Sequence, residues 1–152
     1  MCSSDLVWDY KTGSSYRYSQ ADPFRGGKVI QPLLYLKMAE QRLRAVVDPD
    51  ARATQFGFFF PGLRARGERI VWRSDELDEG TQVLQKLASI AREGAYLATS
   101  DPEECRFCDY RPICGASAAP AALRKLQHPG NEILQPIREL RGDGPKEDST
   151  AD

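Results

Sequence analysis

Residues 6–13 read LVWDYKTG, a short apolar stretch that ends in an acid and a lysine. Side chains of a β-strand alternate between two faces, so Asp9 and Lys11 share one face and the aromatic residues share the other. The aromatic residues favour a strand over residues 5–11, and the Thr-Gly turn that follows ends it. The sequence therefore predicts a carboxylate and an ammonium on one face of a strand end.

The rest of the chain alternates between helical and strand patterns. Apolar residues spaced three and four apart indicate helices, and short aromatic or β-branched runs indicate strands. We expect a helix over 30–47, strands over 54–60 and 69–73 joined by a hairpin loop, a helix from 75 to about 97, a cysteine loop and a short helix over 120–127. This order predicts an α/β fold, and the polar residues from about Leu140 onward are expected to be disordered.

Length and composition are those of a globular domain. The chain has 152 residues, of which 41% are hydrophobic and 28% are charged, and this suffices for one sizeable core. No apolar run approaches the ~20 residues of a membrane span. The N-terminus has no basic region leading into an apolar stretch, so we expect no signal peptide. We therefore expect a cytoplasmic protein with no membrane partner.

Charge is distributed unevenly along the chain. Residues 1–74 hold twelve Lys or Arg against seven Asp or Glu, a balance of +5, whereas residues 75–152 hold nine against fifteen, a balance of −6. A basic half suits a polyanionic partner such as a nucleic acid. Uneven surface charge without a specific partner is the plainer interpretation, because the excess is modest.

Three cysteines lie close together in the phrase CRFCDYRPIC, as Cys105-x2-Cys108-x5-Cys114. Without a secretory signal, clustered cysteines indicate a metal site more than a disulfide framework. Zinc and a four-iron cluster each take four ligands, and Cys2 or His128 could in principle supply the fourth. The alternative is three buried thiols with no metal.

Asp9 and Lys11 have the chemistry of a hydrolytic site. A carboxylate is a hard oxygen ligand suited to Mg²⁺, and a neighbouring lysine can hold a water or stabilise charge that develops on a phosphate. Gln31 and Tyr35 lie at i and i+4, on one helix face, and both side chains can hydrogen-bond a phosphate or a metal-bound water. The structural alternatives are a solvated charge pair and a tyrosine half in the core with a glutamine at its rim.

Together, VWDYKTG, the Gln31-x-x-x-Tyr35 pair and the cysteine phrase resemble the nuclease domain of the AddB/RecB-type subgroup of the PD-(D/E)xK superfamily. The resemblance covers roughly residues 6–115. It implies a partial restriction-endonuclease-like α/β core with a C-terminal cysteine-stapled loop. The implied nuclease domain spans residues 1–115, including a cysteine segment at 101–115, and residues 116–152 form a short helix and a largely disordered tail.

The resemblance also implies a role for each site residue. Asp9 matches an acid that binds Mg²⁺, and the backbone carbonyl of Tyr10 would complete the metal shell. Lys11 matches the lysine that orients the attacking water and stabilises charge in the transition state. Gln31 and Tyr35 match a motif that supports DNA contact near the active site.

The cysteines and partners follow from the same resemblance. Cys105, Cys108 and Cys114 match three of four ligands of a [4Fe–4S] cluster that staples the domain closed, with Zn²⁺ as the alternative. The implied activity is a Mg²⁺-dependent DNA exonuclease in double-strand-break repair, joined to a helicase domain or subunit.

Two departures from the family pattern matter. The family has a second acidic ligand on the strand before the motif strand, and its first cluster cysteine lies far upstream. Asp5 and Cys2 do not occupy those places, so we expect a fragment with little activity alone. The alternative function is a catalytically inactive, metal-stapled module that binds DNA or a partner; a zinc-ribbon-like domain would account for the cysteines but not for the first 50 residues.

Overall fold

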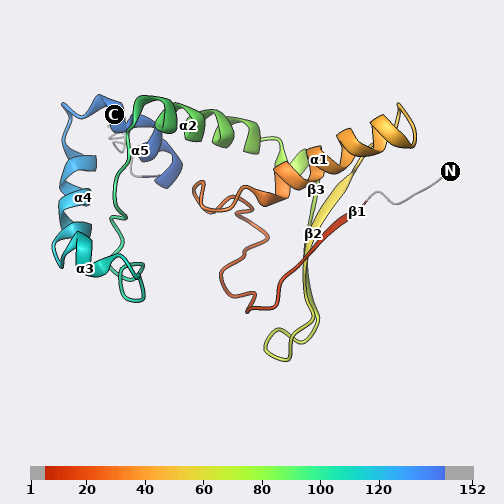
Figure 1. The fold of residues 1–152 in the computed structure, drawn as a ribbon, viewed down its shortest axis with the longest axis horizontal. Coiled ribbons are helices and arrows are strands. Elements are labelled where there is room, and N and C mark those ends of the chain that lie inside the picture. The colour runs from red at the N-terminus through yellow and green to blue at the C-terminus, as the bar shows by residue number, and fades with distance from the viewer. Residues whose placement is uncertain (1–5, 143–152) are drawn as a thin grey trace, which may run out of the picture. The chain divides into compact units, whose positions relative to one another are not determined.

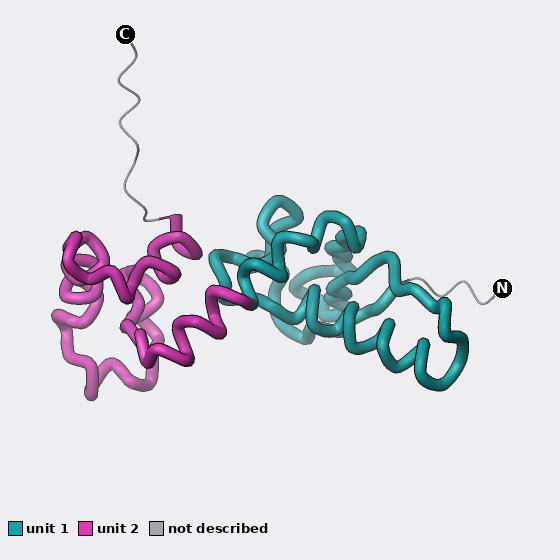
Figure 2. The backbone as a smooth tube through the Cα atoms, turned by 90° about the horizontal axis from the view of Figure 1, so that it is seen from above, with its two compact units in different colours: residues 1–84 teal, residues 85–152 magenta. Residues whose placement is uncertain are grey.

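The computed structural model describes residues 6–142 of the chain. It divides into two compact units, residues 1–84 and residues 85–152, coloured separately in Figure 2. In chain order the elements are β1 (Leu6–Tyr10), α1 (Gln31–Val46), β2 (Gln55–Phe60), β3 (Glu68–Arg73), η1 (Asp75–Leu77), α2 (Gly80–Glu93), α3 (Arg111–Cys114), α4 (Ala118–Gln127), η2 (Glu132–Leu134) and α5 (Gln135–Arg141) (Figure 1). The α/β fold class expected from the sequence is confirmed.

The three strands form one sheet in the order β1-β2-β3. β1 and β2 are parallel and are joined by α1, because parallel neighbours need a crossover rather than a tight turn. β2 and β3 are antiparallel and form the predicted hairpin. Asp9 is paired with Phe58, and Phe58 with Ile70, so these side chains project from the same face of the sheet.

The core of the first unit lies on this face of the sheet. Phe56, Phe58 and Phe60 of β2 are fully buried, and α1 contributes Leu33 and Leu36 to the same cluster. The three phenylalanines occupy every second position of β2, so they project from one face of the sheet, as the two-residue period of a strand requires. Burial of several aromatic side chains is the main source of stability for this unit.

The opposite face of the sheet carries Trp8, Phe59 and Arg69. The Arg69 guanidinium lies over both rings, 5.8 Å from the Trp8 centroid and 5.3 Å from the Phe59 centroid. Trp8 sits against Gly57 of β2: a Cβ built on this glycine would lie 2.6 Å from the indole ring. Gly57 is therefore required by the close approach of the ring.

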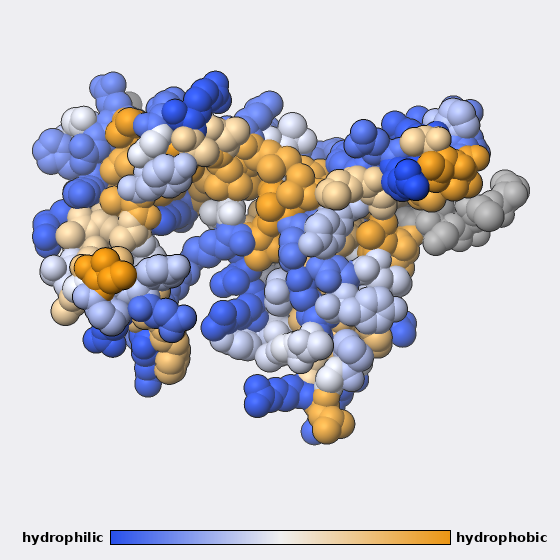
Figure 3. Space-filling model, viewed as in Figure 1, coloured by the Kyte–Doolittle hydropathy of each residue, from blue (hydrophilic) through white to orange (hydrophobic). Residues whose placement is uncertain are grey.

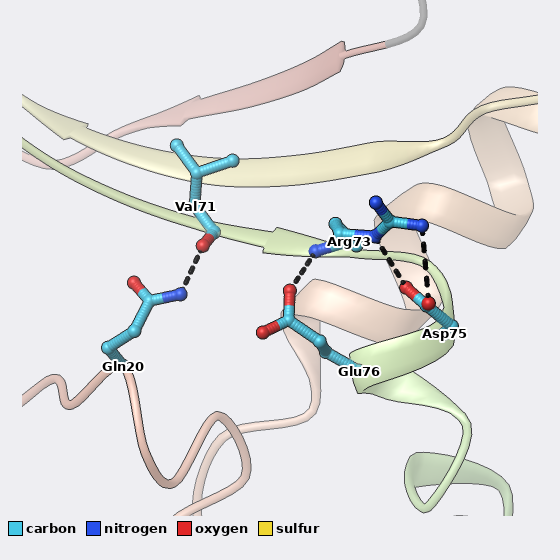
Figure 4. Close-up of polar contacts among 5 residues, drawn as sticks. All are labelled: Gln20, Val71, Arg73, Asp75 and Glu76. Atoms are coloured by element: carbon cyan, nitrogen blue, oxygen red, sulfur yellow. Dashed lines mark hydrogen bonds and ion pairs between the residues drawn. The ribbon is translucent and has the colours of Figure 1, made fainter.

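The long segment between β1 and α1 is pinned to β3, as Figure 4 shows. The Gln20 side-chain amide donates to the Val71 carbonyl oxygen, and Trp72 Nε1 donates to the Gln20 carbonyl oxygen at 2.9 Å. At the end of β3, the Arg73 N–H donates to Glu76 Oε2 at 2.6 Å, and the Arg73 side chain pairs with Asp75 at 3.0 Å. These contacts satisfy backbone groups at the free edge and at the end of the strand.

Helix α1 confirms the predicted helix, but it buries fewer residues than its apolar pattern indicates. Its buried residues are Pro32, Leu33 and Leu36, with the proline in the first turn as expected. Met38 is 62% exposed, and Val47, just past the helix, is 64% exposed. These apolar residues of the later turns of α1 face solvent, so the apolar pattern there does not mark a core.

Helix α2 is shorter than predicted at both ends. The start of the predicted helix forms the separate 3-10 turn η1, and a glycine ends α2 early. The helix begins at Gly80 and ends at Glu93, whereas the sequence pattern extends to about Leu97. Gly94 has φ +66°, and a left-handed residue at this position ends an α-helix. Leu97 therefore lies in extended chain, where it packs against the core of the second unit.

The second unit has a small core of its own, formed by Ala95, Leu126, Leu134 and Ile137. Helix α4 confirms the short helix expected over residues 120–127, but η2 and α5 were not predicted. Disorder was expected from about Leu140 onward, but Leu140 and Arg141 belong to α5, so the prediction is wrong for these residues. The residues after 142 lie outside the described part. No helix among residues 6–142 is long and apolar enough to span a membrane.

Candidate active site

Asp9 and Lys11 form an ion pair at the carboxyl end of β1. Lys11 Nζ lies 2.9 Å from Asp9 Oδ2, and the two side chains are 21% and 17% exposed. Asp9 Oδ2 is fully buried and accepts no hydrogen bond. The short distance is therefore an electrostatic contact without hydrogen-bond geometry, and this carboxylate oxygen keeps acceptor capacity for another ligand.

The ammonium of Lys11 is also bound by the first turn of α1. Lys11 Nζ donates to Gln31 Oε1 at 2.7 Å, and Gln31 Nε2 donates to the Tyr35 hydroxyl at 3.3 Å. Gln31 and Tyr35 share a helix face because they are four residues apart. The structure thus brings the four residues predicted to be catalytic into one connected polar chain, Asp9–Lys11–Gln31–Tyr35.

Lys11 also contacts an aromatic ring of the core. Lys11 Nζ lies 5.0 Å from the centroid of the Phe58 ring, within the range of a cation–π interaction. Phe58 is fully buried, so its ring is held by packing. Sequence patterning placed this residue in a strand but gave no signal that its ring would face the lysine.

The oxygen chemistry of this site fits a hard divalent cation. Mg²⁺ is usually held by one or two carboxylates together with water and substrate oxygens, and the buried, unbonded Oδ2 of Asp9 has the chemistry of such a ligand. Tyr10, whose backbone carbonyl was expected to join the shell, is the last residue of β1. Its side chain is 65% exposed and meets the Phe59 ring edge-on at 5.4 Å.

The cysteines belong to the second unit and are free thiols. Cys105 is half-buried, whereas Cys108 and Cys114 are exposed; Cys114 is the last residue of the short helix α3. No group of three or more His, Cys, Asp or Glu side chains within residues 6–142 is arranged to hold a metal ion. His128 accepts a hydrogen bond from the Gly130 N–H at its Nδ1 atom, and Cys2 lies outside the described residues.

A pocket of about 430 Å³ opens beside Lys11, and sequence reasoning did not identify it. Its lining includes Tyr16 and Arg17 from the loop after β1, and Arg64 from the β2–β3 loop. The signal available in the sequence was that an aromatic and a basic residue, Tyr16 and Arg17, follow shortly after the Asp-x-Lys motif. Their convergence with the hairpin loop, about fifty residues later, is not visible in any local pattern.

Comparison with known proteins gives one family. A family model described as the PD-(D/E)XK nuclease superfamily matches residues 4–115. No match was found among curated proteins or among solved structures. The matched region contains the three-stranded sheet, α1 and the Asp9–Lys11 pair, and its mixed α/β arrangement is consistent with a restriction-endonuclease-like core. The chain therefore belongs to the PD-(D/E)XK nuclease superfamily.

Proposed function

We propose that this chain is the nuclease domain of a DNA exonuclease that depends on Mg²⁺ and works with a helicase in double-strand-break repair. The nuclease family is shown by the match over residues 4–115. The finer proposal is supported by one observation above all: Asp9, Lys11, Gln31 and Tyr35, from two elements, are linked by contacts of 2.7 to 3.3 Å. We place the nuclease domain at residues 1–115, followed by the tail of residues 116–152.

Each side chain of this polar chain has a different role in the proposed reaction. Asp9 would hold the cation with the Tyr10 carbonyl, and a bound Mg²⁺ would supply Lewis-acid stabilisation of the scissile phosphate. Lys11 presents a fixed positive charge where negative charge develops on the phosphate oxygens. Gln31 orients Lys11 through its Oε1 atom, and Tyr35 in turn orients the Gln31 amide.

A [4Fe–4S] cluster held by Cys105, Cys108 and Cys114 is part of this proposal, with Zn²⁺ as the alternative. Its support is the Cys-x2-Cys-x5-Cys spacing and the free state of all three thiols. The three thiols would have to converge to bind a cluster, because the described residues hold no ready metal-binding group. A visible absorption band after anaerobic reconstitution with iron and sulfide would support the cluster, whereas a colourless protein with one bound zinc would replace it.

The partner and location follow from the same proposal. A helicase domain or subunit would supply DNA to the site, and the three free thiols suit a reducing, cytoplasmic compartment. The second candidate is a catalytically inactive module that binds DNA or a protein. It is favoured by the small number of acidic ligands: Asp9 is the one carboxylate in the connected polar chain.

Degradation of linear DNA separates the two candidates. The full chain is incubated with end-labelled DNA in Mg²⁺, and again in EDTA. We expect weak, metal-dependent degradation, in keeping with the little activity expected of this chain alone, and a further loss of about 10²- to 10³-fold for Lys11→Ala, as for removal of one positioned charge-stabilising group. Lys37→Ala, on the exposed part of α1, is the matched control and should match the wild type.

Two outcomes would contradict the enzyme proposal. Equal degradation by the wild type and Lys11→Ala would show that the activity does not come from this site. DNA binding without degradation in any divalent metal would instead support the inactive binding module.

A further inference from the structure

The pocket beside Lys11 has the volume of a small-molecule site and a basic lining. Its volume of about 430 Å³ lies within the roughly 300–1,000 Å³ of small-molecule sites. Lys11, Arg17 and Arg64 contribute positive charge, and none of the ten described residues that line it is acidic. The nearby acid Asp9 is paired with Lys11 at 2.9 Å.

Aromatic rings supply the second feature of the pocket. Tyr16 is 76% exposed and Tyr10 is 65% exposed, although both are large rings. Tyr18, by contrast, is held against the core, with its ring 4.7 Å from Phe58 and 5.4 Å from Phe60. The pocket thus has a fixed aromatic base and two solvent-facing rings that could stack on a base.

The loop that carries Tyr16 is anchored rather than loose. The Tyr18 N–H donates to the Ser15 carbonyl oxygen at 2.8 Å, and the Ser15 hydroxyl donates to Glu68 at the start of β3. The Arg17 guanidinium lies 5.4 Å from the Tyr16 ring centroid, and its Nε donates to the Tyr16 hydroxyl at 2.7 Å. These contacts hold one face of the Tyr16 ring against an arginine.

The hairpin loop closes the other side of the pocket. Arg64 is exposed and lies in the turn between β2 and β3. This turn touches the loop after β1: a Cβ on Gly62 would lie 3.4 Å from the Thr12 carbonyl oxygen. On the face shown in Figure 3, mostly blue and pale residues cover the part of the first unit where these loops lie below the strands of Figure 1, with an orange group at the lower tip.

We infer that this pocket binds one unpaired nucleotide of the DNA strand next to the phosphate that is cleaved, with its base stacked on Tyr16 and a flanking phosphate paired with Arg64. A positively charged groove lined with aromatic rings is the general design for single-stranded nucleic acid. A base inside a duplex has both faces covered by its stacked neighbours, so the pocket favours an unpaired nucleotide. This inference rests on the proposed function, because it takes DNA as the ligand.

Binding without catalysis tests the subsite. The affinity of the full chain for a short fluorescent oligothymidylate is measured by anisotropy in EDTA, over a series of salt concentrations. We expect Tyr16→Ala to lower the affinity roughly 5- to 150-fold, the range for loss of one stacked base, whereas Tyr16→Phe keeps the affinity. Tyr96→Ala removes an equally exposed tyrosine of the second unit and should have no effect.

Arg64 is tested by salt dependence. Loss of one phosphate contact should reduce the slope of log K against log salt by about 0.7 for a single strand, so we expect this change in Arg64→Ala. Arg42→Ala, which removes an exposed arginine of α1, carries the same change of charge and should leave the slope unaltered.

A probe with an abasic site tests whether the Tyr16 ring stacks on a base. One abasic nucleotide, moved through successive positions, should weaken binding to the wild type at one position and have no effect there on Tyr16→Ala. Wild-type affinity in both Tyr16→Ala and Arg64→Ala, or equal losses in the two controls, would overturn the inference. Because no cleavage is measured, these results are independent of the Lys11→Ala activity test: the subsite can fail while the nuclease stands, and the reverse.

Discussion

Lys11 Nζ donates a hydrogen bond of 2.7 Å to Gln31 Oε1, which joins the end of β1 to the first turn of α1 across twenty positions of sequence. The same ammonium lies 2.9 Å from Asp9 Oδ2 and 5.0 Å from the Phe58 ring centroid. Three neighbours of different chemistry thus hold one lysine. Because these contacts hold the Lys11 ammonium in place, it needs to move little when negative charge develops beside it.

Gln31→Leu should lower nuclease activity about tenfold, the effect of losing one hydrogen bond to a charged group. Gln31 acts as a positioning residue for Lys11, so its effect should depend on Lys11. In the Lys11→Ala background the same substitution should cost nothing further, because there is no ammonium left to orient. Rates of DNA degradation for the four proteins of this cycle provide the measurement.

A control for this cycle is Gln41→Leu, which replaces an exposed glutamine on the same helix. It should retain wild-type activity in both backgrounds. Additive losses from Gln31→Leu and Lys11→Ala would show that the amide does not act through the lysine.

Gly57→Ala should destabilise the sheet by about 1–3 kcal/mol, the usual cost of overpacking. The new methyl group would lie 2.6 Å from the Trp8 ring and 3.1 Å from the Val71 side chain. The free energy of unfolding, from urea titration monitored by fluorescence, measures this effect. The second substitution Trp8→Leu should recover part of the loss by making room for the methyl group.

Gly13→Ala is the matched control for Gly57→Ala, since a Cβ at Gly13 meets nothing within 4 Å. Its unfolding free energy should stay within about 0.5 kcal/mol of the wild type, as for a surface substitution. Equal free energies of unfolding for Gly57→Ala and Gly13→Ala would show that the Trp8 ring does not approach Gly57 this closely.

Arg138→Ala should destabilise the second unit by about 3 kcal/mol, because it leaves three carbonyl groups without their donor, one of them in a buried contact and two in part-buried contacts. Arg138 is only 7% exposed, and its guanidinium donates to the carbonyl oxygens of Leu126 at 2.5 Å, His128 at 2.8 Å and Asn131 at 2.9 Å. Lysine cannot replace this planar set of donors, so Arg138→Lys should recover little.

Hydrogen exchange of the α4 amides provides the measurement for Arg138. Protection should fall in both Arg138 variants and remain in Arg124→Ala, an exposed position on α4. Unchanged protection in Arg138→Ala would show that the carbonyl contacts do not hold the end of this helix.

Arg73→Gln should raise the pKa of Asp75 towards its ordinary value. The side-chain hydrogen bond from Arg73, drawn in Figure 4, holds that pKa below the ordinary value. A carboxyl with a lowered pKa in the folded state adds stability above its unfolded pKa, and this is lost as the pH falls through the folded pKa. The pair is exposed, so the change in stability should be small.

NMR titration of the Asp75 carboxyl, in the wild type and in Arg73→Gln, measures this shift directly. Arg52→Gln removes another exposed arginine of the first unit and should leave the Asp75 titration unchanged. An equal shift in both variants would assign the effect to net charge rather than to the hydrogen bond.

The sequence by itself determined the element types, because periodicity and turn chemistry are local properties. Strand β1, helix α1 and the β2–β3 hairpin lie where their patterns predict them. The pattern failed where one residue decides the geometry: Gly94 ends α2 four residues before the apolar pattern stops, since its left-handed conformation breaks the helix. It also failed for η2 and α5, whose stability depends on packing within a small core rather than on a strong local period.

The site was predicted as separate pairs, Asp9 with Lys11 and Gln31 with Tyr35, because two- and four-residue spacings place side chains on common faces. Only the tertiary structure decided that Lys11 bonds to Gln31 and lies over Phe58. The parallel pairing of β1 with β2 brings the carboxyl end of β1 beside the first turn of α1. It also places the loop after β1 against the β2–β3 hairpin, so that Tyr16 and Arg64 line the same pocket. Such long-range juxtapositions depend on chain crossover and packing, which no local pattern in the sequence records.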